Sequence, residues 1–486
     1  MRHISALLLL ILAITVLSSS AENAPASPIT EEVFCDFNPD DLAHKIISVS
    51  SDCSNAAFVV RDGSKMVTVV NGKKGDAYDM IFRPRFSPDG SLCAYVARDF
   101  QNMFVVAGQT KSSSYESVIP SSLLMSPDNK SYSFAAVRVG HYYVVTPDSE
   151  FGPYMDVREM AYNADGSRLV WTASDNDGYA LFINGRRNHK GETSTLTFSD
   201  DGKHFAFLAI GEEMKNGDRK PNSVYINDSK VGTTTRNSIE FAFSPDGKRI
   251  AYTACGEDGR WRMVLDGKEE AFDLVREPVF SADSKHFAFV ARNGEKEFIV
   301  YDRSRSRTHD RVSRPYFSPD GKRIAFVAQM THMEALIENG RMQNEYHDVI
   351  EPVFSPDGKN LAYLSRFDND LFFVLNGIEI RRFTVPYASS LCYSKSGKHF
   401  GYVLHCRDGM CLVVENVEKG KFDEVYPGEK YRSSARFAFE SLKKEDISET
   451  LIYDNLGSRI KMVGDTSMQL VGRKNGKLVR ATVTLD

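Results

Sequence analysis

The sequence predicts an all-β protein, a β-propeller built from about ten four-stranded blades. Three observations support this prediction. A ten-residue cassette occurs ten times, and successive copies begin 36 to 45 residues apart. Short β-branched and aromatic runs follow each copy, separated by Gly, Asn and Asp clusters, and no helical period intervenes. Four strands in about 40 residues is the size of one propeller blade.

The cassette is clearest at residues 243–252, Phe-Ser-Pro-Asp-Gly-Lys-Arg-Ile-Ala-Tyr. It places Pro where φ near −65° is wanted and Gly where φ is positive, so it predicts a tight turn between the first and second strands of each blade. The copies begin at Val49, Phe86, Met125, Tyr162, Phe198, Phe243, Phe280, Phe317, Phe354 and Tyr393.

The tenth cassette residue is aromatic in every copy, and the residue before it is small or medium-sized. A blade has a neighbour on each face, so both faces must be apolar, and large side chains need small ones opposite them. We therefore interpret the aromatic residues as core and not as a carbohydrate or cofactor platform. They are Phe58, Tyr95, Phe134, Trp171, Phe207, Tyr252, Phe289, Phe326, Tyr363 and Tyr402.

A second turn follows the third strand of many repeats and has the sequence Asn-Gly or Asp-Gly. These pairs favour the type I′ turns that join adjacent antiparallel strands. The copies are Asn71-Gly72, Asn184-Gly185, Asp266-Gly267, Asn339-Gly340 and Asn376-Gly377.

The repeats divide the chain into four parts. Residues 1–21 have the basic start, apolar run and small residues of a signal peptide, and the first cysteine is Cys35, too distant for a lipid anchor at the cleavage site. Residues 22–45 form a lead-in, residues 46–436 hold the blades, and residues 437–486 are expected to close or cap the propeller. Two ring arrangements stay open, one large ring or two five-bladed rings.

The bulk composition is that of a folded, soluble protein, and the signal-peptide pattern predicts its export. Hydrophobic residues make up 42% of the chain and charged residues 26%, with a formal net charge of −5. This charge gives no support to a nucleic-acid partner. No second long apolar run follows the signal peptide, so the mature chain should lack a transmembrane segment and lie in the periplasm or outside the cell.

Seven cysteines are too few for disulfide bonds to stabilise the fold of a chain of 486 residues. One pair is close in sequence, Cys406 and Cys411, on either side of Asp408-Gly409. With Asp408-Gly409 as the two-residue turn of a hairpin, the two cysteines face each other where side chains are closest, so a disulfide is possible. The alternative is two thiols on a strand pair. No metal-ligand spacing of Cys and His occurs.

One basic cluster includes Arg303, Arg305 and Arg307, where other repeats have an Asn-Gly hairpin. We interpret it as a longer, charged loop, either merely solvated or in contact with an anionic partner. Residues 175–178, Asp-Asn-Asp-Gly, resemble half of a calcium loop but occupy an ordinary inter-strand turn of the repeat. Residues 211–221 are an insertion within one blade. No catalytic, cofactor-binding or metal-binding residues are predicted.

The cassette, for example Phe354-Ser355-Pro356-Asp357-Gly358, resembles the WD-like repeats of the TolB propeller family over roughly residues 46–425. The resemblance implies a β-propeller that serves as a binding platform in the bacterial envelope. The α/β domain that precedes the propeller in TolB has no counterpart, because only residues 22–45 precede the first repeat here.

Two functions are consistent with these observations. The first is a secreted or periplasmic scaffold, without catalytic activity, that binds a protein or cell-envelope ligand. The second is an enzyme with a site at the central channel, for example a glycan-active hydrolase or lyase. Because the repeated residues explain the fold, we expect recognition where the repeats differ, in the arginine cluster, the 211–221 insertion and the C-terminal residues.

Overall fold

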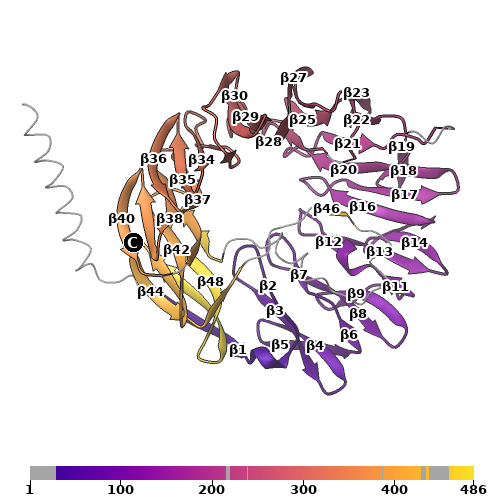
Figure 1. The fold of residues 1–486 in the computed structure, drawn as a ribbon. Coiled ribbons are helices and arrows are strands. Elements are labelled where there is room, and N and C mark those ends of the chain that lie inside the picture. The colour runs from indigo at the N-terminus through magenta and orange to yellow at the C-terminus, as the bar shows by residue number, and fades with distance from the viewer. Residues whose placement is uncertain are drawn as a thin grey trace, which may run out of the picture.

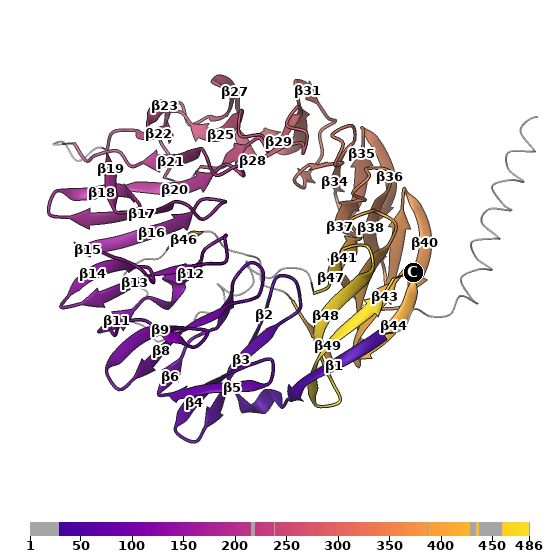
Figure 2. The same cartoon turned by 180° about the vertical axis from the view of Figure 1, so that it is seen from behind.

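The computed structural model describes residues 29–214, 219–237, 239–385, 387–427, 434–436 and 459–485, so the expected signal peptide lies outside the described residues. Within these described residues, eleven antiparallel sheets follow one another around a single ring with a central opening (Figure 1). The same ring is seen from behind in Figure 2. We number the sheets blade 1 to blade 11 in chain order. In Figure 1, β2, β7 and β12 lie nearer the opening than the later strands of the same blades.

Blades 1 to 5 cover residues 42–234. The first strand is a single strand in blades 1, 4 and 5 and is divided into two short strands in blades 2 and 3. Blade 1 contains β2 (Leu42–Val49), β3 (Ala56–Asp62), β4 (Lys65–Val70) and β5 (Lys73–Tyr78). Blade 2 contains β6 (Met80–Ile81), β7 (Arg85–Phe86), β8 (Cys93–Asp99), β9 (Asn102–Ala107) and β10 (Thr110–Lys111). Blade 3 contains β11 (Ser117–Val118), β12 (Leu124–Met125), β13 (Tyr132–Arg138), β14 (His141–Val145) and β15 (Glu150–Tyr154). Blade 4 contains β16 (Asp156–Tyr162), β17 (Leu169–Asp175), β18 (Gly178–Ile183) and β19 (Arg186–Lys190). Blade 5 contains β20 (Thr193–Phe198), β21 (Phe205–Ala209), β22 (Asn222–Ile226) and β23 (Ser229–Thr234).

Blades 6 to 10 repeat the same four-stranded order. Blade 6 contains β24 (Phe241–Phe243), β25 (Ile250–Cys255), β26 (Trp261–Leu265) and β27 (Lys268–Phe272). Blade 7 contains β28 (Leu274–Phe280), β29 (Phe287–Asn293), β30 (Lys296–Tyr301) and β31 (Ser304–Arg305). Blade 8 contains β32 (Arg311–Val312), β33 (Tyr316–Phe317), β34 (Ile324–Met330), β35 (Met333–Glu338) and β36 (Arg341–Tyr346). Blade 9 contains β37 (Asp348–Phe354), β38 (Leu361–Phe367), β39 (Asp370–Leu375) and β40 (Ile378–Phe383). Blade 10 contains β41 (Tyr387–Tyr393), β42 (Phe400–Cys406), β43 (Gly409–Val414) and β44 (Val417–Phe422).

Blade 11 is assembled from both ends of the described chain. Its strands are β45 (Glu424–Tyr426), β47 (Lys461–Val463), β48 (Ser467–Lys474), β49 (Lys477–Thr484) and, as the outer strand, β1 (Ile29–Asp36). β1 pairs antiparallel with β49, from Ile29 opposite Val483 to Asp36 opposite Lys477. A short 3-10 turn, η1 (Pro39–Asp41), then leads into blade 1. This pairing covers the edge of β49, which would otherwise be open.

The β-propeller prediction is confirmed, with eleven blades in one ring instead of about ten. The arrangement of two five-bladed rings is wrong, because hydrophobic clusters join every pair of consecutive blades among the described residues, blade 11 to blade 1 included. At that last junction Phe37 and Phe58 pack with Tyr426 and Leu478. Ten was the number of cassettes, and blade 11 has none.

The cassette aromatics form the core, as predicted. Trp171, Tyr363, Tyr402 and Phe134 are fully buried. Trp171 packs in the cluster shared by blades 3 and 4, where its ring stacks on Phe182 with centroids 5.8 Å apart. Each such side chain fills the space between two sheets, so the stability of one blade depends on both neighbours.

The Ser and Asp side chains of the cassette hold the turn between first and second strands. In blade 8, Ser318 Oγ donates to Asp320 Oδ1 at 2.6 Å and accepts from the backbone N–H of Arg323 at 2.9 Å. Gly321 has φ +70°, and a Cβ there would lie 2.9 Å from Asp283 Oδ1 of blade 7. Consecutive turns are therefore packed against one another.

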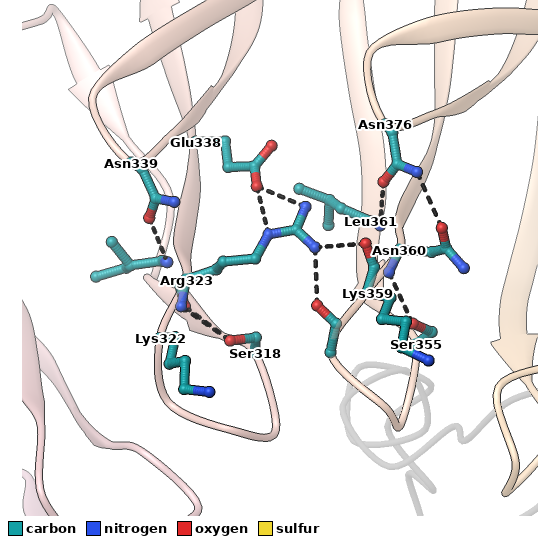
Figure 3. Close-up of polar contacts among 12 residues, drawn as sticks. Ser318, Lys322, Arg323, Glu338, Asn339, Ser355, Lys359, Asn360, Leu361 and Asn376 are labelled. Carbon is teal, nitrogen blue, oxygen red and sulfur yellow. Dashed lines mark hydrogen bonds and ion pairs between the residues drawn. The ribbon is translucent and has the colours of Figure 1, made fainter.

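Arg323 connects blades 8 and 9 (Figure 3). Its guanidinium is bound by Glu338 of its own blade and donates to the carbonyls of Gly358 and Lys359 in blade 9, each at 2.8 Å. Arg249 makes the equivalent contact from blade 6 to Lys285 of blade 7 at 3.1 Å. The Asn339-Gly340 turn, between the third and fourth strands of blade 8, is held to the start of the second strand, because Asn339 Oδ1 accepts from the N–H of Ile324 at 3.0 Å.

Candidate functional site

The cysteine pair lies on the β42–β43 hairpin, but in a different register from the expected one. Cys406 is opposite Gly409, and Cys411 is opposite Leu404. The turn residues are thus Arg407 and Asp408, and the predicted Asp408-Gly409 turn is wrong. Gly409 is required for another reason, because a Cβ there would lie 2.4 Å from the carbonyl oxygen of Phe422.

The two cysteines are therefore diagonal neighbours and not directly opposite each other. Both are thiols in the structure. Burial, followed by the adjacent Cys406 thiol, raises the pKa of Cys411 to about 11. The two sulfur groups are near enough to interact, and a disulfide between them remains a prediction.

The arginine cluster keeps the ordinary two-residue turn, so the expected longer loop at this point is wrong. Tyr301 pairs with Ser304 across Asp302-Arg303, and Asp302 Oδ1 accepts from Phe287 N–H at 3.0 Å, as the Asn residue does in other repeats. Arg305 is bound to Glu270 of blade 6 at 2.5 Å.

Arg305 also lies above the ring of Phe272, 5.3 Å from its centroid. Blade 2 repeats this brace with Lys111, which binds Asp76 of blade 1 at 3.0 Å and lies 5.1 Å from the Tyr78 ring. Arg303 and Arg307 are exposed. Contact with an anionic partner therefore stays a prediction that concerns these two side chains most directly.

Asp175 behaves as a turn residue. It is opposite Gly178, and its carboxylate accepts from the N–H of Asp177 at 2.9 Å and binds Arg187 at 2.6 Å. Across the described ranges, no group of three or more His, Cys, Asp or Glu side chains is arranged to hold a metal ion.

The turns between second and third strands, at the opposite end of each blade from the cassette turns, carry two unusual residues. Phe100 of blade 2 is 80% exposed with φ +54°, and Val139 of blade 3 is 78% exposed with φ +50°. Bulky and β-branched side chains are rarely found in left-handed backbone, and Gly294 occupies the same turn position in blade 7.

Carboxylates from the loops that enter each blade hold these turns. The N–H of Phe100 donates to Asp79 Oδ2 at 2.6 Å, and the N–H of Val139 donates to Glu116 Oε1 at 2.9 Å. The Phe100 ring is also braced by Lys65, whose Nζ lies 5.3 Å from the ring centroid. The two apolar side chains are therefore presented to solvent by supported turns.

The hairpins β8–β9 and β13–β14, which carry these turns, belong to consecutive blades and lie side by side in both views (Figures 1 and 2). Met155, immediately before β16 of blade 4, is 57% exposed. We call Phe100, Val139 and Met155 the turn patch. Sequence reasoning missed it, although a bulky residue where other repeats have Gly was a visible signal.

A second candidate surface is the wall of the central opening at blade 4. A three-residue strand, β46 (Ser434–Arg436), pairs antiparallel with the inner edge of β16, with Glu159 opposite Arg436 and Ala161 opposite Ser434. β46 also contacts η2 (Pro120–Ser122) in blade 3. A cavity of about 530 Å³ lies beside this edge, lined by Ala161, Ala164, Leu196, Phe198 and Pro127, among others.

A Ser–His pair occurs between β41 and β42 of blade 10. Ser389 Oγ is 2.9 Å from His405 Nε2 and accepts from Arg459 Nη1 at 3.2 Å. Burial and the charge of Arg459 lower the pKa of His405 to about 4, so the imidazole is neutral and can accept the hydroxyl proton. Ser389 is only 4% exposed, and Arg459 also donates to Val425 O, so the cluster anchors the chain where it enters blade 11.

No protein-family model matches the chain, and no curated protein matches it. Among solved structures the chain is similar to β-propellers at low identity. TolB from Acinetobacter baumannii is 15% identical, with 56% of this chain and 76% of that chain covered and a TM-score of 0.25. A eukaryotic initiation factor is 15% identical, with 68% and 96% covered and a TM-score of 0.38. The Dos1 propeller is 10% identical, with 69% and 92% covered and a TM-score of 0.32. Likenesses this distant carry no argument about the function of this chain. Within the described ranges, none of the helices has the length and apolar character needed to cross a membrane.

Proposed function

We propose that this chain is a non-catalytic binding scaffold that holds a protein partner on the turn patch of blades 2 to 4. The observation that carries the proposal is the pair Phe100 and Val139, which are about four-fifths exposed in left-handed backbone. Apart from the contact of the Phe100 ring with Lys65, these two side chains are turned to solvent, and Gly at either position would relieve the strain. Exposed apolar groups on a rigid support are the usual centre of a protein-binding surface.

We further propose that the scaffold acts after export, in the periplasm or outside the cell, with a protein or cell-envelope component as its ligand. The signal-peptide pattern of residues 1–21 and the resemblance of the cassette to TolB-like repeats support this location. The mass of the mature chain from an exported fraction tests it. A chain that retains its first residues would contradict it.

The experiment that tests the binding site compares three baits in quantitative affinity capture from envelope extract. The wild-type chain should retain a stoichiometric partner. The double variant Phe100→Gly/Val139→Gly should lose it while remaining at least as stable to heat, because left-handed strain of order 1 kcal/mol per residue is relieved. The control Thr331→Gly makes the same change at the same turn position of blade 8, where φ is +53°, and should retain the partner.

Retention of the partner by the double variant at wild-type level would overturn the assignment to the turn patch. Loss of the partner by both the double variant and the Thr331→Gly control would place the interface elsewhere on this face.

A further inference from the structure

The inner edges of most blades are unsuited to pairing with another strand. Proline stands two residues before the cassette in blades 2, 7, 8 and 9, as Pro84, Pro278, Pro315 and Pro352. Proline cannot donate to a strand ladder, and it protects exposed edges for that reason. Blades 5, 7 and 10 also have left-handed residues in the first strand, which are Thr195, Glu277 and Ser390.

Blade 4, like blades 1, 3 and 6, has neither feature. It has Met160, and β16 pairs without interruption from Glu159 to Tyr162 with β17. Its other edge is paired from Glu159 to Ala161 with β46. The strand that pairs with β16 is β46, which lies in sequence between β45 and β47 of blade 11. Figure 1 places blade 11 on the other side of the opening from β16.

A strand paired with the inner edge of β16 would also contact the cavity beside that edge. Ala161 and Leu196 line it, and Ala164 and Asp200 lie at the exposed cassette turns of blades 4 and 5. Strand addition combines both features, because backbone hydrogen bonds supply affinity and a pocket beside the strand selects one side chain.

The charge around the cavity favours a basic ligand. Asp200 lines the cavity. The hydrogen bond from Ser167 lowers the pKa of the turn residue Asp165, so this side chain is anionic at neutral pH. The next carboxylate, Asp201, is paired with Lys203 at 3.8 Å. The sequence around the resident strand is basic and aromatic, Lys-Tyr-Arg-Ser-Ser-Ala-Arg-Phe over residues 430–437. The sequence that contains the resident strand is therefore basic and aromatic, although the strand itself is Ser-Ala-Arg.

We propose that the inner edge of β16 and its adjoining cavity form a strand-addition site for an extended, basic and aromatic peptide of a second polypeptide, and that residues 434–436 compete with that peptide. The tethered strand acts at an effective concentration of order millimolar, so it lowers the apparent affinity for a peptide in solution. This site is distinct from the turn patch, because the cassette turns and the turn patch lie at opposite ends of the second strands.

The test measures binding of a fluorescein-labelled peptide with the sequence of residues 431–440 by fluorescence anisotropy. The variant Ser434→Pro/Ala435→Pro/Arg436→Pro removes the backbone donors of the resident strand. It should bind the peptide at least about tenfold more tightly than the wild-type chain. The control Ser434→Ala/Arg436→Ala keeps those donors and should bind like the wild type.

A second pair of variants locates the peptide. In the proline background, Ala164→Trp fills the cavity from an exposed position and should reduce peptide affinity at least about tenfold, since it removes the side-chain pocket. Ala282→Trp makes the same change at the same cassette position of blade 7 and should leave the affinity unchanged. Both residues are exposed, so neither variant disturbs the core.

Hydrogen exchange on the wild-type chain provides a readout that needs no substitution. Excess peptide should remove protection from residues 434–436 and leave protection along β16 unchanged. Absence of peptide binding to the folded proline variant, or binding that Ala164→Trp does not weaken, would overturn the proposal, as would unchanged protection of residues 434–436.

Discussion

The guanidinium of Arg323 donates to the carbonyl oxygen of Lys359 across the junction of blades 8 and 9, at 2.8 Å. Both the arginine and its ion-pair partner Glu338 are largely buried, at 21% and 17% exposure of their side chains. One side chain therefore satisfies a carboxylate in its own blade and two carbonyls in the next blade. Consecutive blades are separate sheets joined by short stretches of chain, so the ring depends on contacts of this kind.

Replacement of Arg323 by Ala should lower the free energy of unfolding by about 2 kcal/mol, because the Glu338 carboxylate and two carbonyls lose a charged donor. Urea denaturation followed by circular dichroism measures the change. Arg303→Ala, at an exposed turn, serves as the control and should change stability by less than about 0.5 kcal/mol. Equal effects of the two substitutions would show that the contacts of Arg323 with Glu338, Gly358 and Lys359 contribute nothing to the free energy of unfolding.

The cassette turns make the fold sensitive to acid. Hydrogen bonds from the cassette serines lower the pKa values of Asp246, Asp283, Asp320 and Asp357. A carboxylate with a lowered pKa in the folded chain stabilises the fold above its unfolded pKa of about 4, and this contribution is lost as the pH falls through the folded value. The melting temperature should be nearly constant from pH 7 to about pH 5 and fall below about pH 4.

The variant Asp320→Asn isolates one of these groups. It should melt at a lower temperature than the wild type at pH 7, and the difference should shrink as the pH falls below the folded pKa. Differential scanning calorimetry at matched ionic strength measures both. A difference that stays constant down to pH 2 would contradict the assigned role of the carboxylate.

Each cassette identifies the blade that contains it, so the fold class could be predicted from the sequence. The number of blades could not, because one blade lacks a cassette. Blade 11 has no Ser-Pro-Asp-Gly turn. In its place Asp465 accepts from the N–H of Ser396 in blade 10 at 2.5 Å. The outer strand of blade 11 comes from the far end of the chain, where Ile29 is opposite Val483. Pairing between such distant segments leaves no periodic signal.

The candidate sites were harder to predict for related reasons. Arg305 is conspicuous in sequence, yet its partner Glu270 belongs to another blade and makes it a structural brace. Phe100 stands where other repeats have Gly, but its importance follows only from the positive φ and the exposure that the structure shows. The strand at residues 434–436 pairs with β16 far away along the chain, so no local pattern identifies its partner.

The cysteine pair of the β42–β43 hairpin gives a redox prediction. In protein isolated without reductant we expect Cys406 and Cys411 to be joined, and mass spectrometry of a non-reduced digest tests this. Recovery of both residues as alkylated thiols would contradict it. In reduced protein, the raised pKa of Cys411, about 11, should delay its alkylation until the pH is well above that of an ordinary thiol.

Closure of the ring by β1 gives the last prediction. Removal of residues 1–36 deletes β1, exposes the edge of β49, and breaks the pairs of Glu31 with Lys474 and of Glu32 with Arg480. β1 is largely exposed on its faces, so we expect the shortened chain to fold with a lower melting temperature. Because an uncovered edge strand pairs with other chains, it should also associate in a concentration-dependent way, measured by sedimentation velocity. A chain that lacks only residues 1–28 keeps β1 and should behave as the mature protein. A shortened chain that stays monomeric at all concentrations would show that the edge of β49 needs no cover.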